Sequence, residues 1–130
     1  MKRKLNWLDR RIAHPGPYLV LCKTEQELGA ALDHLGVKDR PVFMASERAN
    51  ATAHFFDNAH DGQLAAVVCI GSTEGRNAIE IAGLLVHEAV HVWQRYARSI
   101  GENNPGDEQE AYAVQAIAQE LMMAYAETVA

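Results

Sequence analysis

The chain has 130 residues, of which 48% are hydrophobic and 22% are charged, and its formal net charge is −5. This length suits one domain with a buried core, and the apolar content excludes a disordered chain. No apolar run is long enough to span a membrane, and the start of the chain lacks the apolar core of a secretory signal. We therefore expect a cytoplasmic domain without membrane contact.

Charge is unevenly distributed along the chain. The first eleven residues hold five basic groups and Asp9, a net of +4, so the remainder carries −9. An acidic body argues against nucleic-acid binding by the main domain. We expect residues 1–17 to form a basic extension, either solvated or in contact with an acidic partner or nucleic acid. Residues 18–130 are expected to form a single domain.

The first predicted elements are a strand and a short helix. The run Tyr18–Lys23 is apolar and β-prone. Thr24 and Glu27 form a capping-box pattern, and Gly36 is a helix stop. Between them, four apolar residues recur at helical spacing and predict the buried face: Leu28, Ala31, Leu32 and Leu35.

Three further strands are expected, over residues 41–45, 53–56 and 63–70. The turn formers of residues 57–62 predict a hairpin between the last two. The run 63–70 is mainly apolar, which favours an interior strand.

Cys22 and Cys69 lie far apart and form no C-x-x-C pair, which is typical of buried free thiols in a reducing compartment, with a single disulfide as the alternative.

Two helices are predicted for the rest of the chain. Asn77 is a good N-cap with Glu80 three residues later, so one helix should run from residue 78 to about residue 99. Gly83 lowers the stability of this helix, and we expect it to permit close packing against the sheet. Asp107 is expected to cap a last helix over residues 108–126.

The segment His87-Glu88-Ala89-Val90-His91 is the motif that carries chemistry. Residues four apart share one face of a helix, so His87 and His91 can bind one metal ion. Glu88 can reach the water beside that metal as a general base, which is the arrangement of a zinc hydrolase. The surrounding helix is largely apolar, and buried charged groups are costly unless they are paired or bind a metal. The alternative is a structural or decayed motif.

A catalytic zinc usually has three protein ligands. The last helix offers Glu108 and Glu110, and the helix periodicity does not choose between them. If Asp107 is the N-cap, Glu110 is the third residue of the helix, and its side chain is expected to fold back and accept the Asp107 N–H. Glu108 then remains free to bind the metal. Both glutamates could instead merely favour the positive helix start.

These two motifs resemble those of the short gluzincin metallopeptidases, including the ImmA-like peptidases of phages and prophages. The match covers the HExxH segment and Glu108–Tyr112. The resemblance implies a zincin-like α+β fold, in which a small mixed sheet packs on the active-site helix and an edge strand can pair with a peptide. It also implies that Glu108 is the third ligand. Tyr112 departs from the pattern, because the relatives often have Asp or Asn there.

Other residues could assist the site. Gln94 lies one turn after His91 and could hydrogen-bond a ligand or substrate. Tyr112 could orient a ligand or stabilise the oxyanion, and His54 could be a transition-state donor. The alternatives are a rim polar residue for Gln94, a core residue for Tyr112 and an ordinary surface or core histidine for His54.

The prediction is a zinc-dependent metallopeptidase that acts on a peptide or protein substrate. We expect the substrate to extend along a sheet edge, for which the strand over Ala65–Ile70 is a candidate. The second hypothesis is a phage-related assembly or interaction protein that keeps the zincin fold without useful turnover. The sequence leaves the substrate and the oligomeric state open.

Overall fold

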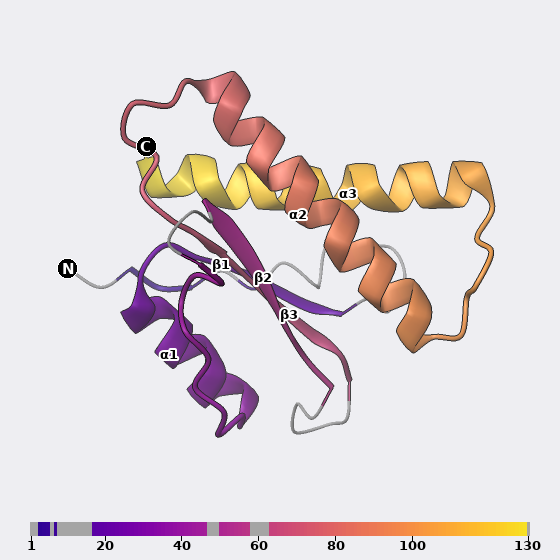
Figure 1. Ribbon diagram of the computed structural model, residues 1–130, viewed down its shortest axis with the longest axis horizontal. Helices are drawn as coiled ribbons and strands as arrows, with labels where there is room; N and C mark the ends of the chain where they lie inside the picture. Colours follow the sequence, from indigo (N-terminus) through magenta and orange to yellow (C-terminus); the bar gives the residue numbers. More distant parts are fainter. Residues whose placement is uncertain (1–2, 6, 8–16, 47–49, 58–62, 130) are drawn as a thin grey trace.

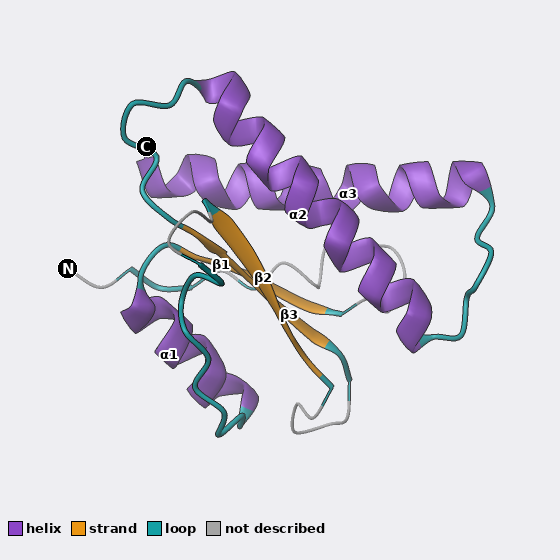
Figure 2. Ribbon diagram, viewed as in Figure 1, coloured by secondary structure: helices purple, strands orange, loops and turns teal. Residues whose placement is uncertain are grey.

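The computed structural model describes residues 3–5, 7, 17–46, 50–57 and 63–129. The elements within these residues are β1 (Tyr18–Cys22), α1 (Glu25–Leu35), β2 (Ala51–Phe56), β3 (Ala65–Ile70), α2 (Ala78–Ser99) and α3 (Asp107–Val129). They form three layers, with α1 on one face of a small mixed sheet and α2 and α3 on the other (Figures 1 and 2). The α+β class predicted from the sequence is confirmed.

The sheet has the strand order β1-β3-β2, with β1 parallel and β2 antiparallel to β3. All six residues of β3 are buried, so the predicted interior strand is confirmed. The same position makes the choice of Ala65–Ile70 as a substrate-binding edge wrong, because both sides of β3 are already paired. The free edge beside α2 belongs to β2. The antiparallel β2–β3 pair agrees with the predicted hairpin, although residues 58–62 of its turn lie outside the described residues.

The predicted strand over residues 41–45 is wrong, because this segment is an irregular loop. Its backbone bonds to side chains of β2 instead of to a neighbouring strand. The Ala45 N–H donates to Thr52 Oγ1 at 3.0 Å, and the Phe43 carbonyl oxygen lies 3.1 Å from His54 Nε2. Val42 is 69% exposed, so the apolar run does not supply a buried strand face.

Helices α1 and α2 begin at the predicted N-caps. The Thr24 side chain accepts the Glu27 N–H at the start of α1, and Gly36 ends this helix with a left-handed φ of 71°. The predicted apolar face of α1 is the buried one, and it packs on one face of β1 and β3. Asn77 and Glu80 form a complete capping box at the start of α2, which has the predicted bounds.

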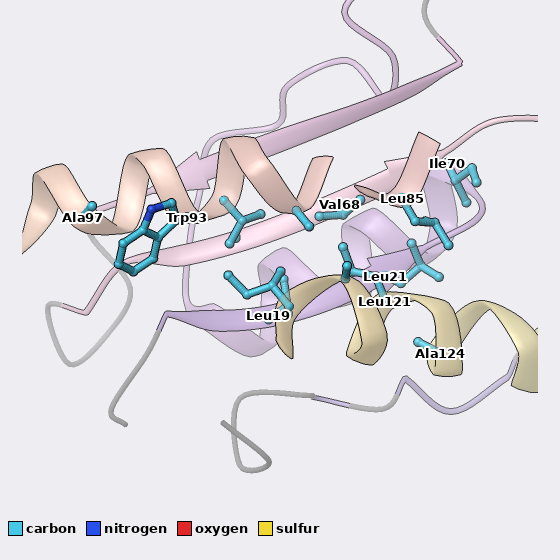
Figure 3. Packing of buried hydrophobic residues seen from close by; sticks show 14 residues of the cluster. Leu19, Leu21, Val68, Ile70, Leu85, Trp93, Ala97, Leu121 and Ala124 are labelled. Carbon is cyan, nitrogen blue, oxygen red and sulfur yellow. The ribbon is translucent and has the colours of Figure 1, made fainter. Parts of the chain in front are cut away.

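The second core lies between the sheet and the two long helices (Figure 3). Leu19, Leu21, Val68 and Ile70 point into it from the sheet, and Leu85 of α2 meets them. Leu121 and Ala124 close this core from α3. The sheet has two edge strands, β1 and β2, and the edge of β2 is the one that lies beside α2. Within the described chain, no helix is both long and apolar enough to cross a bilayer.

Most of the basic N-terminal segment lies outside the described residues, but residues 3–5 and 7 are placed. The Arg3 guanidinium donates to the Leu21 carbonyl at 2.9 Å and pairs with the Glu27 carboxylate at 2.9 Å. Leu5 and Trp7 pack against the core on the α1 side. This part of the segment is therefore attached to β1 and α1 and is not a solvated extension.

Candidate functional site

His87 and His91 lie one turn apart on an exposed flank of α2. Their Nε2 atoms are 3.2 Å apart, and their ring planes are inclined by 78°. Two imidazole nitrogens at zinc-ligand distance in a tetrahedral site stand about 3.3 Å apart. The separation between the two nitrogens is that of a hydrogen bond between the rings, and it is also compatible with two ligands of one divalent cation.

Gln94 contacts the second histidine of the pair. His91 Nδ1 lies 3.2 Å from Gln94 Oε1. In the tautomer with its proton on Nδ1, His91 would donate to this amide oxygen and leave Nε2 available to a metal. Gln94 is thus placed to orient the His91 ring.

Glu88 follows His87 and lies on the side of α2 that faces β2. It is 5% exposed and is the only charged side chain that is buried in the described part of the chain. Burial raises the pKa of this carboxyl, whereas His87, His91 and a hydrogen bond from the Ala53 backbone act in the opposite direction. Its Oε2 lies 4.0 Å from His87 Nε2. A general base with a raised pKa is suited to proton transfer near neutral pH.

Ala53 lies on the free edge of β2, as the hydrogen-bond pattern of the sheet shows. The Gly71 N–H donates to the Asn50 carbonyl at 2.9 Å, which makes these two residues a hydrogen-bonded pair. Such pairs alternate along an antiparallel ladder. The backbone groups of Ala51, Ala53 and Phe55 therefore point away from β3, beside α2. One of them, the Ala53 N–H, meets Glu88.

A pocket of about 510 Å³ lies between the start of β2 and the first half of α2. It includes His87 and Glu88, so it opens directly onto the candidate site. Its lining residues are Asn50, Ala51, Arg76, Glu80, Gly83, Leu84, His87 and Glu88.

The far end of the β2 edge is bounded by Arg95, one turn after His91. The Arg95 guanidinium lies over the Phe55 ring at 5.7 Å and donates to Asp57 Oδ2 at 2.5 Å. Since Asn50 and Ala51 face the first half of α2 and Phe55 faces its second half, β2 and α2 run in the same direction. The edge and the helix thus form the two long walls of one site.

The first turn of α3 differs from the expected cap. The Glu110 N–H donates to the Gly106 carbonyl at 2.9 Å, so the helix begins at Asp107 and Asp107 is not the N-cap. Glu110 Oε2 accepts the Trp93 indole N–H at 2.9 Å. Trp93 follows His91 by two residues, which is about 200° around an α-helix. Glu110 is therefore held on the other flank of α2 from the histidines.

The structure does not bring the expected third ligand to the histidine pair. Glu108 and Tyr112 are exposed, and Tyr112 has 66% of its surface open to solvent. Among the described residues, no three His, Cys, Asp or Glu side chains form a group that could hold a metal ion. Glu108 as a ligand thus stays a prediction from the resemblance.

His54 faces away from α2 and bonds the 41–45 loop.

Several contributors to the site carried no sequence signal. The pairing of β2 with β3 places Ala53 and Asn50 beside the site. The loop before α2 places Arg76 there. The close packing expected at Gly83 is wrong, because nothing lies within 4 Å of the position of a Cβ atom there. Gly83 instead lines the pocket.

Searches with protein-family models, curated protein sequences and solved structures each found no match to this chain.

Proposed function

We propose that this protein is a metal-dependent peptidase with zinc as its metal. The observation that carries the proposal is the convergence of two histidine Nε2 atoms 3.2 Å apart with a buried glutamate at the free edge of a strand. Each part has a chemical use in hydrolysis of a peptide bond. The metal, the base and the peptide-binding edge would lie within one site.

The histidine pair fits a divalent cation by donor type and by the spacing of its nitrogens. His87 and His91 would hold the metal, and Gln94 would orient His91. A bound zinc ion would polarise the peptide carbonyl and lower the pKa of water at the site. A third protein ligand is usual in such sites, and Glu108 remains the candidate that the resemblance implies.

The chain's own residues would bind the substrate and move the proton. An extended peptide can pair with the free backbone groups of β2, which places its carbonyl carbon beside α2. Glu88 would take a proton from the attacking water and deliver it to the leaving amine nitrogen. In doing so it would exchange its hydrogen bond with Ala53 for contacts with the substrate. Burial of Glu88 keeps its carboxylate poorly solvated and reactive.

Measuring zinc content and peptide cleavage for Glu88→Gln tests the proposal. We expect zinc to be retained and cleavage to fall by about 10² to 10⁴, which is the usual contribution of a general base. His87→Ala should lose both zinc and cleavage. Glu74→Gln, which changes a carboxylate outside the site, should retain both. Cleavage by Glu88→Gln at the wild-type rate would refute the proposal.

A second candidate function is a peptide-binding module with a zincin-like site and no turnover. The observation that favours it is the position of Glu108 and Glu110, neither of which forms a metal-binding group with the histidines in the described chain. This function predicts that the wild type binds zinc and extended peptides but cleaves none of them. The same assays therefore separate the two functions.

A further inference from the structure

Gly83 interrupts α2 without any local reason for a glycine. It lies in the first third of a 22-residue helix, where glycine lowers helix stability relative to alanine. Its φ is not positive, and a Cβ atom there would meet nothing within 4 Å. Neither backbone conformation nor close packing therefore explains the residue.

The pocket beside Glu88 gives Gly83 a different role. Gly83 lies one turn before His87 and lines this pocket together with Ala51 of β2. A side chain at position 83 would project into the pocket, because no protein atom fills the space around the missing Cβ. The glycine thus keeps open a volume that continues from the candidate catalytic carboxylate.

A peptide on the edge of β2 would place a side chain in this volume. Alternate residues of an extended chain point to the same side. If one peptide residue lies beside Ala53 and Glu88, the peptide residue two positions away lies beside Ala51, and both side chains point to the same side. The side chain of that residue points towards α2 at the level of Gly83.

The lining of the pocket indicates what kind of side chain fits. Leu84, Ala51 and Gly83 supply apolar surface, and the volume of about 510 Å³ admits a large group. The charged groups are of both signs, because Glu80 and Glu88 are acidic and Arg76 is basic. Glu80 is already bound to the Asn77 N–H at 3.1 Å. This balance favours a bulky uncharged side chain over a charged one.

We propose that Gly83 maintains a subsite for a bulky uncharged side chain, aromatic or leucine-sized, of a peptide bound along β2. Gly83 is then a specificity-determining residue. The inference rests on the proposed function for its choice of a peptide as the ligand and for the pairing of that peptide with β2.

Gly83→Leu and Gly83→Ala test the subsite, with Gly29→Leu as the matched control. Gly29 is also in a helix with nothing within 4 Å of its Cβ position, but it lies in α1, on the other face of the sheet. Both leucine variants should fold, because leucine is a better helix former than glycine and each site is open. Circular dichroism and thermal unfolding would verify this.

The ligands are fluorescein-labelled peptides of uniform Gly-Ser composition that carry a single Ala, Leu or Phe. Fluorescence anisotropy measures affinity, and separate assays measure cleavage. We expect Gly83→Leu to weaken binding of the Phe and Leu peptides by about tenfold, the effect of removing one buried apolar side chain. Its binding of the Ala peptide should remain within about twofold, and Gly83→Ala should be intermediate. Gly29→Leu should match the wild type with every peptide.

The outcomes for the subsite and for peptidase activity are distinguishable. Peptides that are bound with this Gly83 dependence but never cleaved would support the subsite and refute the peptidase. Cleavage with equal selectivity in the wild type and Gly83→Leu would refute the subsite and leave the peptidase standing. Absence of both binding and cleavage by the wild type would overturn both.

Discussion

Glu88 shows how one residue can lower stability and support chemistry. A buried carboxylate is costly unless it is well paired, and this one has a backbone hydrogen bond from Ala53 and a histidine nitrogen 4.0 Å away. Its raised pKa shows that these contacts do not fully offset the loss of solvation. Relative to an exposed glutamate, folding therefore shifts Glu88 towards its protonated form.

We predict that Glu88→Gln raises the melting temperature of the metal-free protein at neutral and alkaline pH. The folded-state pKa of Glu88 lies above its unfolded value, so wild-type stability is lost as pH rises through the folded pKa. Glutamine resembles the protonated acid and does not titrate. The difference in melting temperature should thus vanish in acid, as thermal unfolding at several pH values in chelator would show. A difference that grows towards acid would contradict this.

The sequence predicted the local part of the site and not its long-range part. His87, Glu88 and His91 were found because helical spacing is a property of neighbouring residues. Ala53 could not be found, because its contact with Glu88 depends on the register of two strands and on how α2 lies across them. Strand register is set by tertiary packing, which a single sequence does not display.

At the scale of elements, α3 illustrates why helix phase is hard to predict. An apolar stripe drawn at helical spacing through Val114, Ala118 and Leu121 differs from the observed buried face, which is formed by Ile117, Ala118, Leu121 and Ala124. This rotates the buried face towards Glu110, which lies seven residues before Ile117 and so shares its face. The many alanines of α3 make its two sides similar in hydrophobicity. In contrast, α2 had strong capping signals and its bounds were predicted correctly.

We predict that Glu110→Gln lowers the free energy of unfolding by about 1 kcal/mol, because it weakens the charge-assisted bond from the Trp93 indole. Zinc affinity should stay unchanged, since Glu110 lies on the other flank of α2 from the histidines. Chemical denaturation and competition with a zinc chelator would measure the two effects.

Glu108→Gln is the matched variant, since its carboxylate is exposed two residues earlier. It should leave the stability of the metal-free protein unchanged. A loss of zinc affinity in this variant alone would establish Glu108 as the third ligand. The same loss in Glu110→Gln would contradict the arrangement of α3 described above.

The whole molecule is held together by two cores on either side of one thin sheet. The strand β3 contributes Val67 and Cys69 to one core and Val68 and Ile70 to the other. Such a layered domain could be predicted in outline from the sequence of strands and helices. The attachment of the basic N-terminal segment could not be predicted, because a run of basic residues does not indicate which carbonyl or carboxylate each of them will contact.

We predict that Arg3→Ala lowers the free energy of unfolding by about 1–2 kcal/mol, because Arg3 donates a charge-assisted hydrogen bond to the Leu21 carbonyl and forms an ion pair with Glu27. Lys4→Ala removes the neighbouring charge from an exposed side chain and should change stability by less than about 0.5 kcal/mol. Urea denaturation of both variants would test this. Equal effects would show that the N-terminal charge itself, and not the Arg3 contacts, affects stability.

The free edge of β2 is also a surface on which two molecules can join. Backbone groups that are open to a peptide are equally open to the same strand of another copy, and unprotected edges promote aggregation. The buried Glu88 carboxylate beside the edge opposes such pairing. A second strand would have to take the place of Glu88 at the Ala53 N–H, and the carboxylate would then be buried without this hydrogen bond and without water. The catalytic candidate would thus also protect solubility. Removal of its side chain by alanine would expose the edge, whereas glutamine retains an acceptor for the Ala53 N–H.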